Sequence, residues 1–339
     1  MLVRRYIQTP GFETVVIGGK QGVPPFPGID FRAVSPAFWP LGNTNLRYAA
    51  AVAEVLRNLR PAMVEVHNRP EMALALAARL PAIPVVGFLH NDPLGMREAT
   101  TAAERRELLR RLACVVTPSD WLRTRLLDGI ADPPKPPVVL PNCLDLTEIP
   151  PPVRRERLVL FAGRVVADKA PDAFISAYAA ASPYLNGWLA EIIGADRFSP
   201  DSPDTPFLQT IRGAASGAGV RMLGYRDHSE VLATMNRAAI VVMPSRWPEP
   251  FGLVALEAMA CGAALICSPR GALPEVAGDA ALYADPDNVP DIAAAIRLLG
   301  TNESRRMALA SQGRLRARQF DITVVAEQLA ALRHRVLGG

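Results

Sequence analysis

The sequence predicts an α/β protein of two doubly wound domains, each a parallel sheet with helices on both faces. Three observations support this fold class. Short apolar runs alternate with longer segments of helical period along most of the chain. The runs are too apolar to have a solvated face, which is typical of parallel strands. The alternation is interrupted once, by a proline-dense stretch, and then restarts.

The amino-terminal half contains the first series. The expected strands are Phe12–Ile17, Met63–His67, Val85–His90, Cys114–Thr117 and Val138–Leu140, and the expected helices are Leu46–Leu59, Glu71–Leu80 and Ala102–Leu112. A doubly wound domain opens with a strand, a glycine-rich turn and a helix, and that strand is central in the sheet. Here Phe12–Gly18 already reads as a second strand and Met1–Tyr6 as the end of a helix. We therefore expect this domain to lack its first β-α unit, with the true start upstream; the alternative is that Leu2–Ile7 replaces part of it.

The proline-dense stretch, DPPKPPVVLPN followed by EIPPPVRRER, predicts a semi-rigid connector. We expect one domain at residues 1–148, a second at 149–320, and a last helix at 321–339 that packs back on the first domain. After the connector, the expected strands are Leu158–Ala162, Trp188–Gly194, Val220–Leu223, Ile240–Met243 and Ala264–Cys267. The expected helices are Asp172–Ala181, Pro206–Gly217, Ser229–Ala238, Val254–Cys261, Asn302–Gln319 and Thr323–Leu337.

The composition excludes several classes of protein. The 339 residues carry a net charge of +4, which is too mild to suggest a nucleic-acid binder. No stretch is apolar enough for a membrane span, and the first residues do not resemble a signal peptide. Four cysteines without CxxC spacing indicate a reducing cytoplasm and argue against structural zinc.

The densest chemical signal is Val241–Pro274, where a buried strand leads through a proline-rich loop into a helix. Glu249 lies on the loop and Glu257 about one turn into the helix. Ionised carboxylates accept strong hydrogen bonds from hydroxyl groups. The amides of Phe251–Leu253, including Gly252, begin the helix, and a helix start attracts phosphate. The segment thus predicts recognition of a polyol beside an anion, although either acid alone fits a solvated carboxylate or a helix cap.

The string PEPFGLVALEAMACG resembles the E-x7-E signature of retaining glycosyltransferases of family 4, which have the GT-B fold. The likeness extends over nearly all of residues 60–320. It implies an enzyme that transfers a hexose from a nucleotide-diphosphate sugar to an acceptor hydroxyl. It also implies an acceptor-side first domain and a donor-binding second domain with a cleft between them. Glu257 would then hold the ribose, and Glu249 the sugar hydroxyls.

The second domain opens with LFAGRVVADKAPDAF, which places Gly163, Arg164 and Lys169 after its first strand. Two cations there could clamp a diphosphate. The family uses a GR…KG pair in this way, so the resemblance assigns Arg164 and Lys169 to the donor diphosphate, with Ala170 in place of the usual glycine. Only three of the 37 basic residues are lysines, which supports a specific role for Lys169 over that of an exposed lysine at a helix start.

Weaker signals complete the predicted site. LGYRDHSEV resembles the segment where the family's backbone meets the nucleotide base, here Gly224, Tyr225 and Arg226. His90 ends a strand where family members commonly have a histidine over the donor sugar; the alternative is a histidine bound to a neighbouring loop. His67 also ends a strand and could line the acceptor side, whereas His228 reads as a surface residue. No metal-ligand spacing occurs, and the family generally needs no metal, so we expect no cofactor.

The implied partners are a nucleotide-sugar donor and a glycan or glycolipid acceptor, as in lipopolysaccharide or exopolysaccharide assembly in the cytoplasm. The helix AAERRELLRRLA carries Arg105, Arg106, Arg110 and Arg111, which could meet anionic lipid at the inner face of the membrane. The alternative for this helix is a solvated face balanced by Glu104 and Glu107.

Three other functions share this fold class. A nucleotide-sugar epimerase does not carry these motifs. A phosphorylase needs a lysine for pyridoxal phosphate, and Lys169 is the only lysine of the second domain. A non-catalytic sugar-nucleotide-binding or scaffold protein stays open, because the expected first β-α unit is missing.

Overall fold

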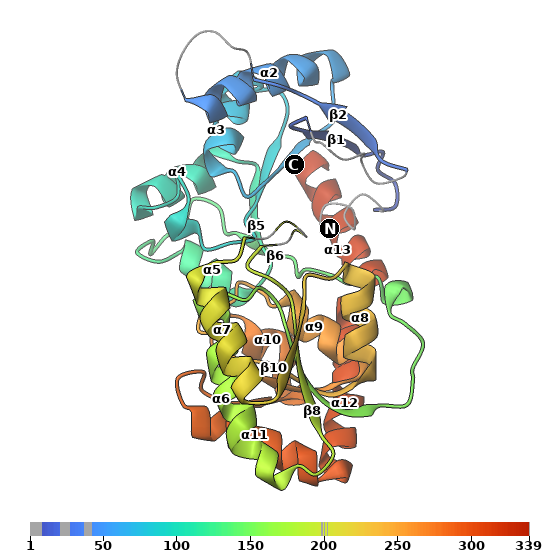
Figure 1. Ribbon diagram of the computed structural model, residues 1–339. Helices are drawn as coiled ribbons and strands as arrows, with labels where there is room; N and C mark the ends of the chain where they lie inside the picture. The colour runs from blue at the N-terminus through green and yellow to red at the C-terminus, as the bar shows by residue number, and fades with distance from the viewer. Residues whose placement is uncertain are drawn as a thin grey trace. The chain divides into compact units, whose positions relative to one another are not determined.

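The computed structural model describes residues 9–20, 28–36, 43–197, 199, 201 and 203–338. These residues form two compact units (Figure 1). The first runs up to Cys143 and includes the chain again from Ile322 onward, and the second is continuous from Leu144 to Asp321. The division between them lies five residues before our boundary at 148/149. The expected helix at Met1–Tyr6 and the alternative at Leu2–Ile7 lie outside the described residues.

The second unit contains a six-stranded parallel sheet in the order β12-β11-β10-β7-β8-β9. Its strands are β7 (Glu156–Ala162), β8 (Leu189–Ile193), β9 (Val220–Gly224), β10 (Ala238–Met243), β11 (Ala264–Cys267) and β12 (Ala281–Tyr283). The chain order reverses direction between β7 and β10, so these two central strands mark the topological switch point. Ligands of doubly wound sheets bind beyond the carboxyl ends of the strands at such a point.

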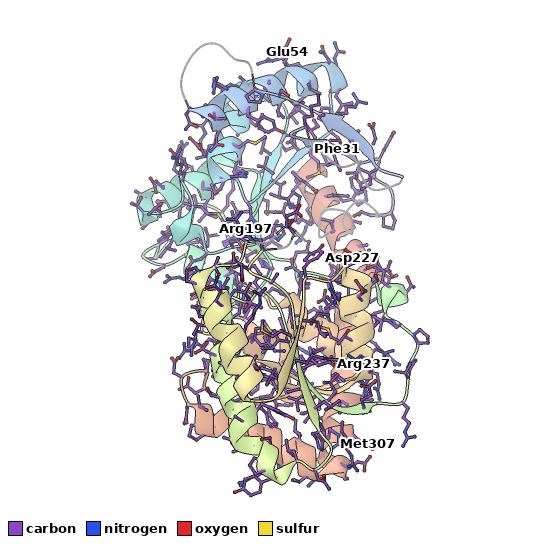
Figure 2. The ribbon with its side chains drawn as sticks, in the orientation of Figure 1. Phe31, Glu54, Arg197, Asp227, Arg237 and Met307 are labelled. Carbon is purple, nitrogen blue, oxygen red and sulfur yellow. The ribbon has the colours of Figure 1, made fainter. Side chains whose placement is uncertain are left out.

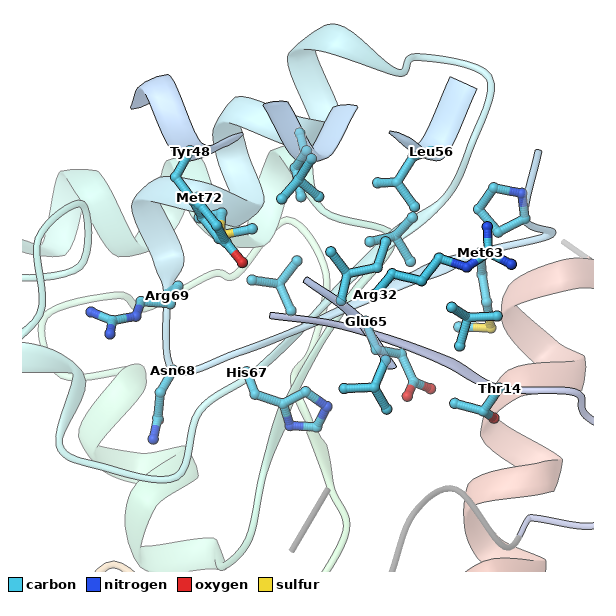
Figure 3. Close-up of a pocket in the computed structure, with 18 of the residues that line it drawn as sticks. Thr14, Arg32, Tyr48, Leu56, Met63, Glu65, His67, Asn68, Arg69 and Met72 are labelled. Atoms are coloured by element: carbon cyan, nitrogen blue, oxygen red, sulfur yellow. The ribbon is translucent and has the colours of Figure 1, made fainter. Parts of the chain in front are cut away.

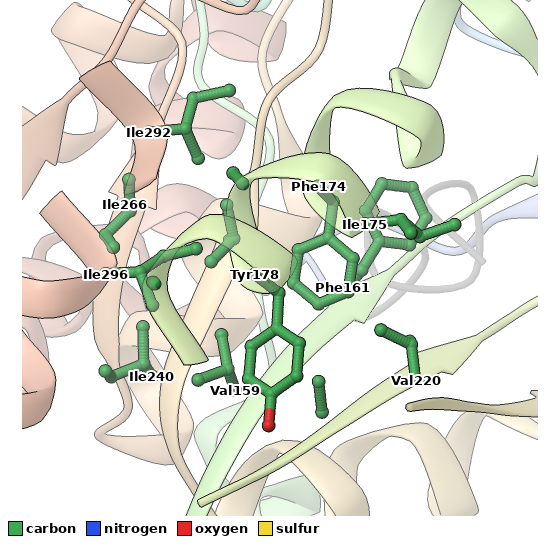
Figure 4. Close-up of a cluster of buried hydrophobic side chains, with 14 of the residues drawn as sticks. Val159, Phe161, Phe174, Ile175, Tyr178, Val220, Ile240, Ile266, Ile292 and Ile296 are labelled. Atoms are coloured by element: carbon green, nitrogen blue, oxygen red, sulfur yellow. The ribbon is translucent and has the colours of Figure 1, made fainter. Parts of the chain in front are cut away.

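Each central strand of this sheet divides its side chains between two cores. In β7, Val159 and Phe161 belong to one buried cluster and Leu158 and Leu160 to the other, as the period of two requires. Figure 4 shows the first cluster, where the rings of Phe161 and Phe174 lie 5.7 Å apart. Helices α6 (Pro171–Ala181), α7 (Pro206–Gly217) and α11 (Val289–Thr301) contribute to the first cluster, and α8 (His228–Arg237), α9 (Leu253–Cys261) and α10 (Leu273–Ala277) to the second. Helix α12 (Glu303–Ala317) contributes to both.

The first unit contains a four-stranded parallel sheet, β3 (Val64–His67), β4 (Val85–Phe88), β5 (Cys114–Thr117) and β6 (Val138–Val139), and a separate parallel pair, β1 (Val15–Gly18) and β2 (Asp30–Ala33). Helices α2 (Thr44–Leu59), α3 (Pro70–Arg79), α4 (Ala102–Arg111) and α5 (Asp120–Leu126) pack against one side of the four-stranded sheet. Helix α13 (Ile322–Gly338) covers the other, where Val325 and Leu329 meet Val86 and Phe88.

The predicted strands and helices agree with these elements to within a few residues. Two strands, β2 and β12, and three helices, α5, α10 and α11, were not predicted from the sequence. Strand β2 offers only Phe31 as a partly buried residue, and β12 is three residues long. Such short segments do not complete an apolar period, so the pattern carries no signal for them.

Candidate active site

Three glycines end neighbouring strands of the second unit at the edge where the switch point lies. Gly163, Gly194 and Gly224 follow or end β7, β8 and β9, and all three have positive φ. A Cβ on Gly194 would lie 1.8 Å from the carbonyl oxygen of Gly163, so these two turns pack backbone to backbone. The absence of side chains leaves the strand ends open to a ligand. Arg164 follows in the same turn and is half-buried.

Lys169 is held by a turn with an unusual conformation. It ends the short helix η3 (Ala167–Lys169), and Ala170 then adopts the left-handed conformation at φ +54° before α6 begins. This conformation explains why the family prefers glycine at this position, since glycine adopts it without a Cβ penalty. The carbonyl of Asp168 accepts hydrogen bonds from the amides of Arg246 (2.8 Å) and Trp247 (3.0 Å). The turn that carries Lys169 is therefore joined to the loop after β10.

Glu249 lies on that loop and is only 7% exposed. Its Oε1 accepts hydrogen bonds from Nζ of Lys169 and from Oγ of Ser245, the latter at 2.8 Å. Its backbone carbonyl accepts from the amide of Ala272 at 2.8 Å. A Cβ on Gly271 would lie 2.4 Å from both the amide nitrogen and the carbonyl oxygen of Glu249. Lys169 and Ser245 thus hold the carboxylate, and Gly271 and Ala272 hold the backbone of Glu249.

An ion-pair network supports the same loops from outside. Arg246 forms a bidentate contact with Asp172 at 2.8 and 2.7 Å and a further bond to Asp287 at 3.0 Å. These bonds raise the pKa of Arg246 above its usual value, with Asp172 as the main cause. Arg270 donates to Asp287 at 2.6 Å. These four side chains join the first turn of α6 to the loops after β10, β11 and β12, and so support the segments that carry Lys169 and Glu249.

Helix α9 places the second predicted carboxylate. Its N-cap is Gly252 at φ +96°, where a Cβ would lie 2.5 Å from Leu273. The amides of Phe251, Gly252 and Leu253 are at this helix start, as predicted. Glu257 is 6% exposed, and its Oε1 lies 2.9 Å from Nε2 of His228. His228, predicted to be a surface residue, keeps 30% of its side chain exposed, but the first turn of α8 also places its ring against Glu257.

The predicted base-contacting segment joins β9 to α8. Gly224 has φ +70°, Tyr225 is half-buried and Arg226 is exposed. The guanidinium of Arg226 donates to the carbonyl of Tyr225 at 2.9 Å. Asp227 caps α8, and Figure 2 shows Asp227 and Arg237 at the two ends of this helix. The cap fixes the start of α8 and with it the position of His228.

In the first unit, His67 at the end of β3 and His90 in the segment after β4 form a pair. Nδ1 of His67 lies 2.9 Å from Nε2 of His90, and the two rings are parallel to within 1°. Oδ1 of Asn68 accepts from the backbone amide of His90 at 2.7 Å. Burial lowers the pKa of His67 to about 4, helped by Arg333, and burial and His67 lower that of His90 to about 3. Both rings are neutral near pH 7, and one donates to the other.

The arginines of α4 do not all reach solvent. Arg105 is 3% exposed, and its guanidinium donates to the carbonyls of Leu126, Ala99, Thr100 and Asp128. The expectation that Arg105 meets lipid is wrong, because it closes the end of α5. Arg110 forms a bidentate pair with Glu107.

In the part of the chain that the structure describes, no three His, Cys, Asp or Glu side chains come together as metal ligands would. No helix of the described residues is both long and apolar enough to span a membrane.

Two family descriptions match the chain: "Glycosyl transferases group 1" over residues 147–316 and "Glycosyltransferase Family 4" over residues 2–148. The glycogen synthase of Mycobacterium tuberculosis is 30% identical over 294 residues, which are 81% of this chain and 69% of the relative. The O-antigen chain mannosyltransferase B of Escherichia coli is 40% identical over 117 residues, 34% of this chain and 30% of the relative. The structure of Anabaena HepE with UDP-glucose superposes with a TM-score of 0.72 at 19% identity, over 90% of this chain and 85% of HepE.

Proposed function

The chain belongs to the group 1 glycosyl transferases, and we propose that it transfers a hexose from a nucleotide-diphosphate sugar to a hydroxyl of a glycan or glycolipid with retention at the anomeric carbon. The names of its relatives, a glycogen synthase and an O-antigen mannosyltransferase, support a polysaccharide or lipopolysaccharide acceptor. HepE, which has the same fold, binds UDP-glucose, and this supports a nucleotide-sugar donor. We place the reaction in the cytoplasm, with glycolipid acceptors met at the inner face of the membrane.

The buried pair of Lys169 and Glu249 at the switch point carries the proposal. A lysine ammonium has three N–H donors, so one bond to Glu249 leaves two for phosphate oxygens. Glu249 accepts on Oε1, which leaves Oε2 for the hydroxyls of the donor sugar. Lys169 then contacts the phosphate and Glu249 the sugar, on either side of the scissile bond. Because the two residues are paired, they align the sugar with its leaving group.

The departing diphosphate gains negative charge as the bond from C1 to the phosphate oxygen breaks. Lys169, Arg164 and the amides of Phe251–Leu253 supply fixed positive charge and hydrogen-bond donors for it. The acceptor oxygen attacks C1 from the same face and its proton passes to the leaving phosphate oxygen, which retains the configuration. No carboxylate acts as a nucleophile in this scheme, and we expect no metal requirement.

The remaining residues hold the donor. Glu257 accepts hydrogen bonds from the ribose hydroxyls, and His228 orients its carboxylate. Backbone groups of Gly224–Arg226 contact the base. We assign neutral His90 to the sugar near its 6-hydroxyl, where a neutral ring adds no positive charge to an oxocarbenium-like carbon.

A donor panel tests the proposal. UDP-, GDP- and ADP-hexoses are added to the protein with and without oligosaccharide acceptors, while melting temperature, nucleotide diphosphate release and the anomeric configuration of the product are measured. One of the nucleotide sugars should raise the melting temperature. Its nucleotide diphosphate should be released, and the product should have the same anomeric configuration as the donor. An inverted product would refute retention, and binding without release under all acceptors would instead favour a sugar-nucleotide-binding protein.

A further inference from the structure

A groove of about 1160 Å³ lies in the second unit, at the edge of the sheet opposite to the candidate active site. Glu156 and Leu189, the first residues of β7 and β8, line it, whereas the candidate site lies beyond the other ends of these strands. Another wall is α12, whose lining residues recur at the three- and four-residue spacing of one helix face. Figure 2 shows Met307 of this helix at the far end of the unit from Asp227.

Arginines are the main charged residues of this groove. Its charged lining residues are five arginines and two glutamates: Arg154, Arg155, Arg157, Arg306, Arg314, Glu156 and Glu303. Glu156 accepts a hydrogen bond at 2.6 Å from Arg237, which does not line the groove. The side chain of Glu303 is 76% exposed and lies 3.8 Å from Arg306. The other four arginines form no ion pair with any Asp or Glu among the described residues.

Two arginines elsewhere in the chain show how a carboxylate neutralises such a charge. In a cavity of about 1040 Å³ in the first unit (Figure 3), Arg333 donates to both carboxylate oxygens of Glu65, at 2.7 and 2.8 Å. In the second unit, the half-exposed Arg212 pairs with Asp204 at 2.7 Å. Neither arginine needs a further anion. The groove differs, because most of its arginines have no such partner in the part of the chain that the structure describes.

Arg155 and Arg314, the first arginine pair, meet at the end of α9. Arg155 donates to the carbonyls of Asn236 and Cys261, in the last turns of α8 and α9. A Cβ on Gly262 would overlap the guanidinium of Arg314 and lie 2.9 Å from that of Arg155, so both groups lie against this glycine. A helix end carries about half a negative charge, so α8 and α9 offset about one of the two positive charges. Burial and the nearby Arg314 lower the pKa of Arg155, as expected where positive charge is in surplus.

Arg157 and Arg306, the second arginine pair, lie along the same groove. Arg306 donates to the carbonyl of Leu299, in the last turn of α11, at 2.6 Å. Burial lowers the pKa of Arg306; Glu303 opposes this shift and the positive charge of Arg157 adds to it. Arg157 donates to the carbonyl of Asn186 at 3.2 Å, which is a neutral partner. The second pair therefore also carries more positive charge than its surroundings offset.

Apolar side chains form the rest of the lining. Tyr184, Leu189 and Met307 line the groove although 60%, 60% and 63% of their surfaces are exposed. Beside them, the guanidinium of Arg306 lies 5.2 Å from the ring centre of Trp188. Large apolar side chains that are exposed together in a concave surface favour a ligand with an apolar part. The groove therefore suits an organic anion better than an inorganic one.

We propose that the groove binds a soluble organic bisphosphate, with one phosphate group at each arginine pair. Guanidinium groups hold phosphate oxygens through paired, charge-assisted hydrogen bonds. Arg306 and Arg314 are eight residues apart on α12, which is about 12 Å along a helix, so a flexible body of several carbon atoms connects the two phosphates. This body covers Tyr184 and Met307. The volume of the groove is sufficient for such a molecule.

The ligand of the groove is neither the sugar donor nor the acceptor. Lys169 and Glu249 lie beyond the carboxyl ends of β7 and β10, and the groove lies at the amino ends of the same strands. Helix α9 connects the two places, with Gly252 at the candidate active site and Gly262 at the first arginine pair. The inference concerns a separate site and does not depend on the proposed donor chemistry.

Calorimetric titration with hexane-1,6-diyl bisphosphate tests the proposal. The titrated protein is Lys169→Met, which has lost a cation of the proposed donor site, so binding there does not mask the groove. We expect one bisphosphate per chain. Hexyl phosphate should bind at least about tenfold more weakly, because it engages one arginine pair at a time.

Arg157→Gln and Arg314→Gln, each added to Lys169→Met, remove one exposed arginine from each pair. Each should weaken binding of the bisphosphate at least about tenfold, the effect of losing a charge-assisted hydrogen bond. Arg305→Gln is the matched control, since Arg305 is an exposed arginine of α12 that does not line the groove. It should change the affinity no more than about twofold. Melting temperatures show that all three variants are folded.

Three outcomes would overturn the proposal. Absence of bisphosphate binding would mean that the groove is not a site for this ligand class. Equal loss of affinity in Arg305→Gln and the two groove variants would show attraction by net charge alone. Sedimentation of the protein with phosphatidylglycerol vesicles that requires Arg157 and Arg314, without binding of the soluble bisphosphate, would identify a membrane surface as the partner. None of these readouts requires turnover or a sugar donor, so they are independent of the proposed function.

Discussion

The ammonium group of Lys169 donates a hydrogen bond to Oε1 of Glu249, although the two residues are 80 positions apart in the chain. Lys169 lies in the turn after β7 and Glu249 in the loop after β10, and these strands are neighbours at the centre of the sheet. Two motifs that the sequence presents separately are thus one ion pair, and each side chain positions the other.

Replacement of Lys169 by methionine should lower kcat/KM for sugar transfer by about 100-fold or more, the usual effect of losing one fixed group that stabilises transition-state charge. The loss should include kcat, because the charge on the diphosphate grows as the bond breaks. The rate of nucleotide diphosphate release measures the activity of the variant. Lys20→Met, at an exposed lysine of the first unit, is the control and should keep full activity. Equal activity of the two variants would remove Lys169 from the mechanism.

Gly271→Ala should disable the enzyme through Glu249. The new Cβ would lie 2.4 Å from backbone atoms of Glu249, and the φ of +67° adds strain, so the carboxylate must move. We expect kcat to fall at least tenfold in the same assay. Gly213→Ala is the matched control, since it lies in α7 with nothing within 4 Å of its Cβ and should stabilise the fold slightly. Normal activity of Gly271→Ala would contradict the positioning role of this glycine.

The two glutamates, Arg164 and Lys169 could be proposed as site residues from the sequence because they stand in short contiguous motifs. Ser245 and Gly271 could not, although both fix Glu249. Their contacts depend on how the loops after β10 and β11 meet, and a local pattern holds no information on that. The contact between His228 and Glu257 could not be predicted for the same reason, since it depends on how α8 and α9 pack together.

The strands likewise differ in how well the sequence predicts them. Strands buried on both faces, such as β10 and β11, stand out as apolar runs, and their predicted ends are close to those observed. Strand β2 is mostly exposed and has no such run. Its existence follows from pairing with β1, which is a tertiary property.

The histidine pair should make the protein less stable as the pH falls from 7 to 5. Burial holds the pKa of His67 at about 4 and of His90 at about 3, below the 6.5 of an unfolded chain. The unfolded state therefore binds more protons below pH 6.5, and acid favours unfolding until the folded histidines titrate near pH 3 to 4. Each histidine adds up to about 1.4 kcal/mol per pH unit to the slope of the unfolding free energy against pH. Urea unfolding at pH 7, 6 and 5 measures the unfolding free energy and hence this slope.

The matched variant for this test is His67→Gln, which retains polar atoms but removes one titrating group. Its unfolding free energy should depend less on pH, by about one proton between pH 6 and 5. His334→Gln, at an exposed histidine, should leave the slope unchanged. Identical slopes in all three proteins would show that the His67–His90 pair does not carry the pH dependence.

Glu257→Gln should weaken donor binding more than it slows the chemical step. A carboxylate on ribose hydroxyls holds a part of the donor that does not react, and such uniform binding appears in KM rather than in kcat. Hydrogen bonds to a charged group contribute about 1.5–3 kcal/mol each, so KM for the donor should rise about 10- to 100-fold while kcat changes little.

Glu303→Gln, at a glutamate whose side chain is 76% exposed, controls for the loss of one negative charge from the same unit. Glu257→Gln should also weaken the binding of nucleotide diphosphate alone, because this ligand carries the ribose but not the transferred hexose. A fall in kcat with unchanged affinity for the nucleotide would instead place Glu257 at the reacting carbon and exchange its role with that of Glu249.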